Sequence, residues 1–300
     1  MSAAGDAAGF AFYKAFALLI RLMPRPAVLA LGRGLGRAAF RLDRKHRRIA
    51  LDNLALAFGE EKTPAEREAI ARASFANVGR TALDVIKLSG WTADRIRGLV
   101  DVEGGDLLAG ALRAGRGVLA FTAHFGNWEV SPSRLSELGA FSAVARRLDN
   151  RGIDRDLLRL RRRMGAEIID KFGAGRPILQ ALAGGGIVAI VVDQNVLRDQ
   201  AVFVDFFGRP AATTPSLAAF HLKTGAPMVP FFCRPSGRRY RLRILPPVEV
   251  PRSGRRDADV LKTTQIYTKM IEHEIRREPE LWLWIHKRWN TRPADEAKDA

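Results

Sequence analysis

Short apolar segments alternate with helical segments between residues 101 and 250, and this alternation constrains the fold more than any other feature. The runs GVLAFTA at 117–123 and IVAIVVD at 187–193 are almost purely apolar, which is typical of strands buried on both faces. Further strands are predicted at 141–145, 202–207, 227–233 and 240–245. Helices are predicted at 127–138, 154–164, 177–183 and 215–223. The alternation predicts an α/β layered fold.

The first 100 residues lack such runs and are predicted to be helical. NLALAF at 53–58 closes one helix before Gly59, and Thr63-Pro64-Ala65-Glu66 is a capping box that opens another. We therefore expect an N-terminal helical subdomain at 1–100, an α/β domain at 101–292 and a frayed tail at 293–300. A last helix is predicted at 257–277.

The chain is strongly basic: 49 Lys and Arg against 32 Asp and Glu give a net charge of +17. Such a charge indicates a negative partner, which can be nucleic acid, an anionic membrane surface or an acidic protein. No segment reaches the roughly 20 apolar residues of a membrane span. Phe10, Tyr13, Phe16 and Ile20 recur at helical spacing, which favours a helix of about 13 residues in the membrane interface. The alternative is a helix packed on the domain.

Several kinds of site are disfavoured by the sequence. Cys233 is the only cysteine and lies in an apolar run, so we expect a buried thiol and neither a disulfide nor a cysteine cluster. The five histidines are scattered and no HExxH motif occurs, so no metal site is expected. GxSxG and Walker A motifs are also absent, and LGRGLGRA at 31–38 is not a dinucleotide-binding motif.

The string AHFGNWEV at 123–130 carries the strongest chemical signal. His124 directly follows a predicted buried strand, and sites of α/β sheets gather at the carboxyl ends of strands. Glu129 can reach His124 only if the histidine lies in the turn and Glu129 in the first helical turn. A carboxylate on one ring nitrogen leaves the other as a general base. The alternative is that His124 caps the helix and Glu129 is a favourable first-turn anion.

HFGNWE resembles the H-x4-D/E motif of the glycerolipid acyltransferase superfamily. Other blocks narrow the resemblance to the bacterial lipid A biosynthesis lauroyl/myristoyl acyltransferase family. They run in family order over about residues 45–292 and read NLALAF, TPAERE, HFGNWE, RRLDN, VDQN, FVDFFGRPAATT, KTGAPMVP and PELWLWIHKRW. The mycobacterial phosphatidylinositol mannoside acyltransferases share several blocks. The resemblance implies a mixed, largely parallel central sheet flanked by helices, with the N-terminal helical subdomain against the membrane.

The resemblance implies transfer of a fatty acyl chain from an acyl-carrier-protein thioester to a hydroxyl of a lipid A precursor. His124 would be the general base, oriented by Glu129. No cofactor is expected, because acyl carrier protein is a co-substrate. The expected partners are this carrier, a phosphorylated glycolipid acceptor and an anionic membrane surface, with no nucleic acid. The expected location is the cytoplasmic face of the inner membrane.

Six further residues are assigned to the oxyanion or the substrates. Asn127, backbone N–H groups after Gly126 or an arginine can stabilise the oxyanion, although Asn127 can equally be a helix N-cap. The resemblance places an arginine about thirty residues beyond Glu129, nearest Arg161, whose alternative is a solvated helix face. Arg147 and Asn150 are assigned to a phosphate or sugar of the acceptor. Asp193 and Gln194 end the predicted strand 187–193 and are therefore expected at a carboxyl edge of the sheet, where they serve the substrate or a strand-capping turn.

Alternatives stay open from the sequence. The acceptor can be another glycolipid such as a phosphatidylinositol mannoside, and the donor can be acyl-coenzyme A. The length of the acyl chain and the oligomeric state are not encoded in any local pattern. A basic membrane- or nucleic-acid-binding protein without catalysis is the alternative from charge alone. WLWIHKRW at 282–289 mixes aromatic and basic residues, which predicts a tryptophan at the membrane interface or, alternatively, core packing.

Overall fold

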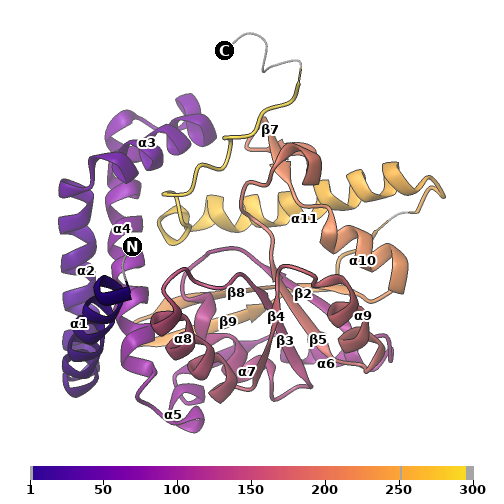
Figure 1. Cartoon of the computed structure of the whole chain (residues 1–300). Helices are drawn as coiled ribbons and strands as arrows, with labels where there is room; N and C mark the ends of the chain where they lie inside the picture. Colours follow the sequence, from indigo (N-terminus) through magenta and orange to yellow (C-terminus); the bar gives the residue numbers. More distant parts are fainter. Residues whose placement is uncertain (1–2, 251, 295–300) are drawn as a thin grey trace.

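The computed structural model describes residues 3–250 and 252–294 and contains a central sheet of seven strands (Figure 1). The strand order is β1-β9-β8-β2-β5-β3-β4, and all neighbours are parallel except β8 and β9. The predicted mixed, largely parallel sheet is confirmed. Its strands are β1 (Val100–Glu103), β2 (Val118–Thr122), β3 (Phe141–Ala145), β4 (Ala166–Asp170), β5 (Ile187–Val191), β8 (Met228–Ser236) and β9 (Arg239–Ile244).

Helices form the N-terminal region, as predicted, and flank the sheet. The N-terminal helices are α1 (Ala3–Leu22), α2 (Arg25–Leu42), α3 (Arg44–Phe58), η1 (Gly59–Glu61), α4 (Pro64–Leu88) and α5 (Ala93–Arg97). The others are α6 (Gly105–Leu112), η2 (Trp128–Val130), α7 (Pro132–Leu135), α8 (Arg151–Arg163), α9 (Gly175–Ala183), η3 (Arg198–Gln200), α10 (Ser216–Thr224), α11 (Arg256–Arg277) and η4 (Pro279–Leu281). The predicted capping box of Thr63 and Glu66 opens α4. The predicted frayed tail falls mainly on residues 295–300, outside the described residues.

Both faces of the sheet are buried, because alternate residues of its central strands belong to different core clusters. Leu119 and Phe121 of β2 pack in the cluster that includes residues of α9, α10 and α11. Val118 and Ala120 pack in the cluster that includes residues of α6, α7 and α8. Figure 1 shows α11 on one side of the sheet and α6 and α7 on the other. This arrangement explains why β2 reads as a continuous apolar run.

Three local features differ from the expectations drawn from the sequence. The predicted strand at 202–207 forms as β6 (Val202–Phe206), but it lies outside the central sheet and pairs with β7 (Arg209–Thr213) in a separate hairpin. The predicted helix 127–138 is broken into η2 and α7. Asn127 itself is not helical, because its φ of −124 and ψ of 76 lie outside the helical region, and its backbone N–H donates to the Cys233 carbonyl at 2.9 Å. Strands β1 and β4 were not predicted from the sequence, because their charged residues interrupt the apolar pattern that identifies buried strands.

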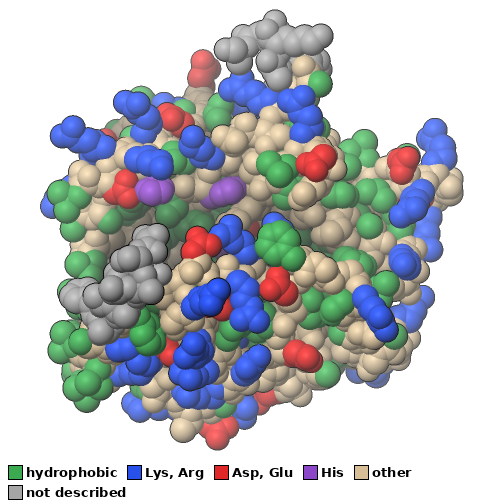
Figure 2. Space-filling model, viewed as in Figure 1, with side chains coloured by type: hydrophobic (Ala, Val, Ile, Leu, Met, Phe, Trp, Pro, Cys, Tyr) green, Lys and Arg blue, Asp and Glu red, His purple; other side chains and the backbone are tan. Residues whose placement is uncertain are grey.

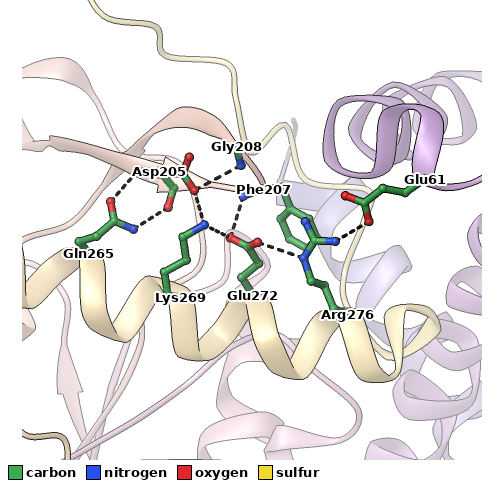
Figure 3. Close-up of polar contacts among 8 residues, drawn as sticks. All are labelled: Glu61, Asp205, Phe207, Gly208, Gln265, Lys269, Glu272 and Arg276. Carbon is green, nitrogen blue, oxygen red and sulfur yellow. Dashed lines mark hydrogen bonds and ion pairs between the residues drawn. The ribbon is translucent and has the colours of Figure 1, made fainter.

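The β6–β7 hairpin is fastened to α11 by a polar network (Figure 3). Its turn residue Phe207 has φ +56, a left-handed conformation that is costly for a bulky residue. The Phe207 N–H donates to the Glu272 carboxylate at 2.8 Å. Lys269 and Arg276 also donate to Glu272, at 2.9 and 3.0 Å, and Arg276 reaches Glu61 at 2.6 Å. These bonds hold the strained turn and tie the hairpin to the N-terminal helical region.

Glycines on α2 and α4 bring the two helices into backbone contact. A Cβ atom on Gly32 would lie 2.6 Å from the Gly79 carbonyl oxygen, and one on Gly36 would collide with the Phe75 carbonyl. Both distances are far below ordinary carbon contacts. Gly32 and Gly36 of LGRGLGRA therefore serve close helix packing, which agrees with the failure of this string to match a dinucleotide-binding motif.

A buried ion pair joins this helical layer to the sheet. Arg25, at the start of α2, donates to both oxygens of Asp84 on α4, at 2.8 and 2.7 Å. The Tyr240 hydroxyl on β9 also donates to Asp84 and accepts from the Asn127 amide at 2.9 Å. All four side chains are buried. The chain of bonds runs from the N-terminal helices to the segment that follows β2.

The apolar stripe of α1 faces the protein. Ile20 is fully buried, and Tyr13 and Phe16 line a cavity next to α4 and α8. The alternative interpretation of this stripe, as a helix packed on the domain, therefore describes its structure. A different set of leucines on α1 and α2 is exposed, namely Leu18, Leu19, Leu22, Leu31, Leu35 and Leu42. Among the described residues, no helix has the length and apolar content needed to cross a bilayer.

The close packing of α2 on α4 predicts opposite effects for two glycines of the same helix. Gly36→Ala should destabilise the protein by about 1–3 kcal/mol, because the new methyl group meets the Phe75 carbonyl. Gly34→Ala is the matched control: no heavy atom lies within 4 Å of the place that its new methyl group would take, so it should stabilise the helix by about 0.5–1 kcal/mol. Urea unfolding followed by circular dichroism measures both. Equal effects would contradict the packing.

Candidate active site

The parallel pairing of β2 with β5 brings two polar side chains together at the carboxyl edge of the sheet. Thr122 pairs with Val191, and each strand ends there. His124 and Asp193 each lie two residues beyond their strand. The edge where parallel strands end is where sites of α/β sheets gather. The equal offset places the imidazole beside the carboxylate.

The segment that carries His124 is held from two sides. The Gly126 N–H donates to the Leu281 carbonyl at 2.9 Å, and the Leu283 N–H donates to the His124 carbonyl at 3.1 Å. On the other side Gly126 abuts Cys233 of β8, and a Cβ atom there would collide with the Cys233 carbonyl. Gly126 also has φ +60, so glycine is required on two counts. The loop is thus rigidly placed by β8 and the C-terminal segment.

His124 and Asp193 form a close pair. His124 Nδ1 lies 2.8 Å from Asp193 Oδ1, and the His124 backbone N–H donates to Oδ2 at 3.0 Å. The Trp282 indole N–H also donates to Oδ2, at 2.7 Å. With Nδ1–H donating to the carboxylate, Nε2 is the unprotonated nitrogen of neutral His124. Nε2 is therefore the atom available to accept a substrate proton.

Electrostatics favour the charged form of this pair. Burial lowers the pKa of His124, but the charge and hydrogen bond of Asp193 outweigh it, so the pKa lies above the usual value. Burial raises the pKa of Asp193, but His124, Trp282 and the backbone N–H outweigh it, so that pKa is lowered. Asp193 is thus an ionised, fixed partner for an imidazolium that forms on His124.

Glu129 does not bind the imidazole, so the predicted His124–Glu129 pair is wrong in its geometry. Glu129 instead accepts two bonds from the Arg161 guanidinium, at 2.9 and 2.6 Å. The spacing argument failed because η2 and α8 bring Arg161 opposite Glu129 while β5 supplies Asp193. Glu129 still lies close enough that its charge raises the pKa of His124, and the charge of Arg161 lowers it.

A mostly apolar cavity of about 460 Å³ opens onto His124 and Glu129. This volume lies in the range of about 300–1,000 Å³ that is usual for ligand sites. Its walls come mainly from α1, α4, α8 and the segment at 281–283. The apolar and aromatic lining residues are Tyr13, Phe16, Val78, Ala82, Val85, Ile86, Trp128, Ile153, Leu157, Leu160, Leu281 and Leu283. The cavity can take a long apolar chain with its polar end beside the imidazole.

The other predicted site residues are divided between the site and the scaffold. Asn127 is fully buried, bonds to Tyr240 and neither caps η2 through its side chain nor lines the cavity. Asn150 is the N-cap of α8, accepting from two backbone N–H groups. Arg147 is exposed and pairs with Asp154 and Asp170. Gln194 lies beside the imidazole, with its amide nitrogen 3.5 Å from His124 Nε2.

The expected oxyanion donors are only partly available. The N–H groups of Gly126 and Asn127 are bound to the carbonyls of Leu281 and Cys233. The next two N–H groups, of Trp128 and Glu129, have no acceptor within the described part of the chain. Their residues line the cavity beside His124. These groups and Arg161 remain as candidates for stabilising negative charge.

The three tryptophans of the segment 282–289 lie in the core, so the predicted interfacial tryptophan is wrong. Trp282, Trp284 and Trp289 are 1%, 0% and 8% exposed. Trp282 is instead a site residue that the sequence did not identify, because it binds Asp193. His286 accepts from the Asn195 N–H at 2.8 Å and so holds the segment after Asp193. An Asp and a Trp distant in sequence give no local signal of this contact.

The sequence disfavoured two kinds of site, a reactive cysteine and a metal centre. Cys233 is buried, and burial raises the pKa of its thiol to about 12. Within residues 3–250 and 252–294, no three His, Cys, Asp or Glu side chains are grouped as metal ligands.

Comparisons with known proteins agree with the resemblance noted in the sequence. A family model described as bacterial lipid A biosynthesis acyltransferase matches residues 5–291. The lipid A biosynthesis lauroyltransferase of Escherichia coli is 29% identical over 279 residues, 92% of this chain and 89% of that protein. The lipid A biosynthesis palmitoleoyltransferase of the same organism is 30% identical with the same coverage. A phosphatidylinositol mannoside acyltransferase of Mycolicibacterium smegmatis is 29% identical over 252 residues, 82% of this chain and 80% of that protein.

The pairing of His124 with Asp193 predicts an unequal effect of removing each nearby carboxylate. In the wild type, NMR titration of the His124 ring should give a pKa above about 6.5, the usual value. Asp193→Asn should lower this pKa, because it removes the dominant negative charge and the hydrogen bond. Glu129→Gln is the control and should lower it less. A larger effect of Glu129→Gln would restore the pairing that the sequence predicted.

Proposed function

Because the chain belongs to the bacterial lipid A biosynthesis acyltransferase family, we propose that it transfers a fatty acyl chain from an acyl-carrier-protein thioester to a hydroxyl of a lipid A precursor. The observation that carries this proposal is the position of His124. Its Nδ1 is held by Asp193, and the ring lines an apolar cavity of about 460 Å³. A general base beside a cavity that can hold an apolar chain suits acyl transfer to an alcohol.

The proposed chemistry follows from this geometry. His124 Nε2 takes the hydroxyl proton as the acceptor oxygen attacks the thioester carbonyl. Asp193 orients the ring and stabilises the imidazolium. Charge on the carbonyl oxygen is stabilised by Arg161 and the free N–H groups of Trp128 and Glu129. When the carbon–sulfur bond breaks, the imidazolium returns the proton to the departing thiolate.

Glu129 has a supporting role in this proposal. It holds the Arg161 guanidinium by two parallel bonds, an arrangement that fixes both position and orientation. An arginine fixed in this way can also bind a phosphate of the acceptor. The thioester already carries an activated acyl group, so the reaction requires no resident cofactor.

A phosphatidylinositol mannoside is the second acceptor to test, because a relative with that name is as similar as the E. coli lauroyltransferase in percentage identity. Acyl-coenzyme A is the second donor.

The proposed location is the cytoplasmic face of the inner membrane. The exposed leucines of α1 and α2, which we call the leucine face, support this location; Leu22 is 75% exposed and Leu42 is 81% exposed. The leucine face consists of Leu18, Leu19, Leu22, Leu31, Leu35 and Leu42. Exposed arginines of α2 flank these leucines. Apolar side chains beside basic ones are typical of surfaces that dock on anionic lipid.

The reaction is tested with purified protein in mild detergent. Lauroyl- and myristoyl-loaded carrier protein is supplied with a Kdo-bearing tetra-acyl lipid A precursor, and mass spectrometry detects an added acyl chain. His124→Ala should reduce the rate at least ~100-fold, because it removes the general base. His46→Ala, on the exposed surface of α3, is the matched control and should leave the rate unchanged.

Each other outcome has a defined meaning. Acylation that survives His124→Ala would refute the base assignment and keep the reaction. Acylation of phosphoinositide mannosides alone would move the proposal to the second acceptor. Failure to acylate either lipid from either donor would refute the proposed function.

The leucine face predicts vesicle binding that depends on two particular side chains. Leu22→Asp with Leu42→Asp should weaken binding to phosphatidylglycerol-containing vesicles at least ~10-fold, since each buried leucine contributes about 1.5–3 kcal/mol. Leu197→Asp is the matched control, because Leu197 is 65% exposed but lies outside α1 and α2. Vesicle co-sedimentation measures both. Unchanged binding of the double variant would rule out this face.

A further inference from the structure

A second cavity lies on the outer side of α8, on the opposite side of that helix from the apolar cavity. It has a volume of about 680 Å³, and its lining includes Arg147, Arg151, Arg155, Arg159 and Arg162. Figure 2, viewed as in Figure 1, shows Lys and Arg side chains gathered over the part of the molecule where α8 lies. We call this surface the α8 groove.

Much of the positive charge in the α8 groove is not neutralised within the protein. Arg159 pairs with Asp156 and Arg147 pairs with Asp154. Arg151, Arg155 and Arg162 have no carboxylate partner within the described ranges. Their spacing of four and seven residues places them on one face of the helix. The groove therefore presents a stripe of exposed guanidinium groups to an outside partner.

The opposite face of α8 belongs to the candidate active site. Ile153, Leu157 and Leu160 line the apolar cavity, and Arg161 binds Glu129. A partner in the groove would thus be separated from the cavity by one helix, whose diameter with side chains is about 10–12 Å. The groove is also distinct from the leucine face, which is formed by α1 and α2.

Exposed apolar side chains accompany the arginines. Leu148 lines the groove and is 43% exposed. Phe172 is 77% exposed and follows by two residues Asp170, which pairs with Arg147. Arginine and aromatic residues together are characteristic of protein interfaces, whereas a phosphate site gains nothing from exposed apolar groups. The surface therefore fits an acidic protein better than a lipid phosphate.

We propose that the α8 groove is the docking surface for an acidic acyl carrier protein, an inference that rests on the proposed function. The carrier's flexible arm would pass the edge of α8 and place its thioester beside His124. The lipid acceptor would approach from the leucine face, so that the soluble donor and the membrane-bound acceptor use different surfaces. Charge complementarity of this kind accelerates encounter and makes binding depend on salt.

The test is a triple charge reversal, Arg151→Glu with Arg155→Glu and Arg162→Glu. Binding of fluorescent holo-acyl carrier protein is measured by anisotropy at low salt. The wild type should bind, and the variant should bind at least ~10-fold more weakly. The matched control reverses three exposed arginines near the start of α11, Arg252, Arg255 and Arg256, and should bind like the wild type. Circular dichroism verifies that both variants fold.

Kinetics add a second readout. The α8 variant should raise KM for acyl carrier protein at least ~10-fold and leave turnover of acyl-pantetheine, which lacks the protein, unchanged. A higher KM for the lipid acceptor alone would assign the groove to acceptor phosphates and overturn the proposal. A higher KM for acyl-coenzyme A, without carrier binding, would assign it to the nucleotide and also overturn it.

The two proposals fail in different ways. Carrier binding that depends on the groove, with no lipid acylated, would refute the proposed reaction and keep the docking surface. Acylation from the carrier that is insensitive to the triple reversal would refute the docking surface and keep the reaction.

Discussion

The parallel pairing of β2 with β5 is the constraint on which the candidate site depends. Hydrogen bonds between the strands fix Thr122 opposite Val191, and both chains leave the sheet at that level. The Val192 N–H then donates to the Thr122 carbonyl at 3.1 Å, and beyond it His124 Nδ1 meets Asp193 Oδ1 at 2.8 Å. A shift of one residue would turn one side chain to the other face of the sheet. The register of two buried strands thus determines which carboxylate the histidine meets.

The N-terminal helices complete the site. Their close contact through Gly32, Gly36 and Gly79 aligns α2 with α4, and α4 lines the apolar cavity. The buried pair of Arg25 and Asp84 then fixes this layer to Tyr240 on β9. Breaking a buried pair from one side typically costs 3–5 kcal/mol, so the arrangement is well determined. Both the N-terminal helices and the segment that follows β2 therefore form the walls of the cavity. The domain boundary predicted at residue 100 stays a prediction.

Local sequence patterns predicted the positions of strands and helices better than they predicted which strands pair with one another. The apolar runs of β2, β5 and β8 identified buried strands, and the capping box identified the start of α4. The segment VFVDFF has the same apolar character, but the left-handed turn at Phe207 folds it into a hairpin outside the sheet. Patterns within a strand contain no information on strand order. For this reason Asp193 was expected at a carboxyl edge, but its contact with His124 could not be derived.

The same limitation explains the assignment of Trp282. Aromatic and basic residues alternate in WLWIHKRW as they do at membrane interfaces, but burial depends on what the folded chain places around them. Trp282 is buried because the segment crosses the loop that holds His124, and its indole N–H then satisfies the second oxygen of Asp193. The local composition indicated that the Trp282 side chain is amphipathic. It could not show whether the indole N–H meets a lipid interface or a buried carboxylate such as Asp193.

The two carboxylates of the site have different partners, and this difference bears on the H-x4-E spacing. Asp193 comes from a neighbouring strand and binds the imidazole, which is the role that a general base requires of its partner. Glu129 lies on η2, one short turn beyond His124, and binds Arg161 from α8. The five-residue interval therefore brings the Glu129 carboxylate and the Arg161 guanidinium that it binds close to His124, while the imidazole binds Asp193. In the proposed reaction, this spacing places a fixed positive charge near the thioester while the base keeps its own anionic partner.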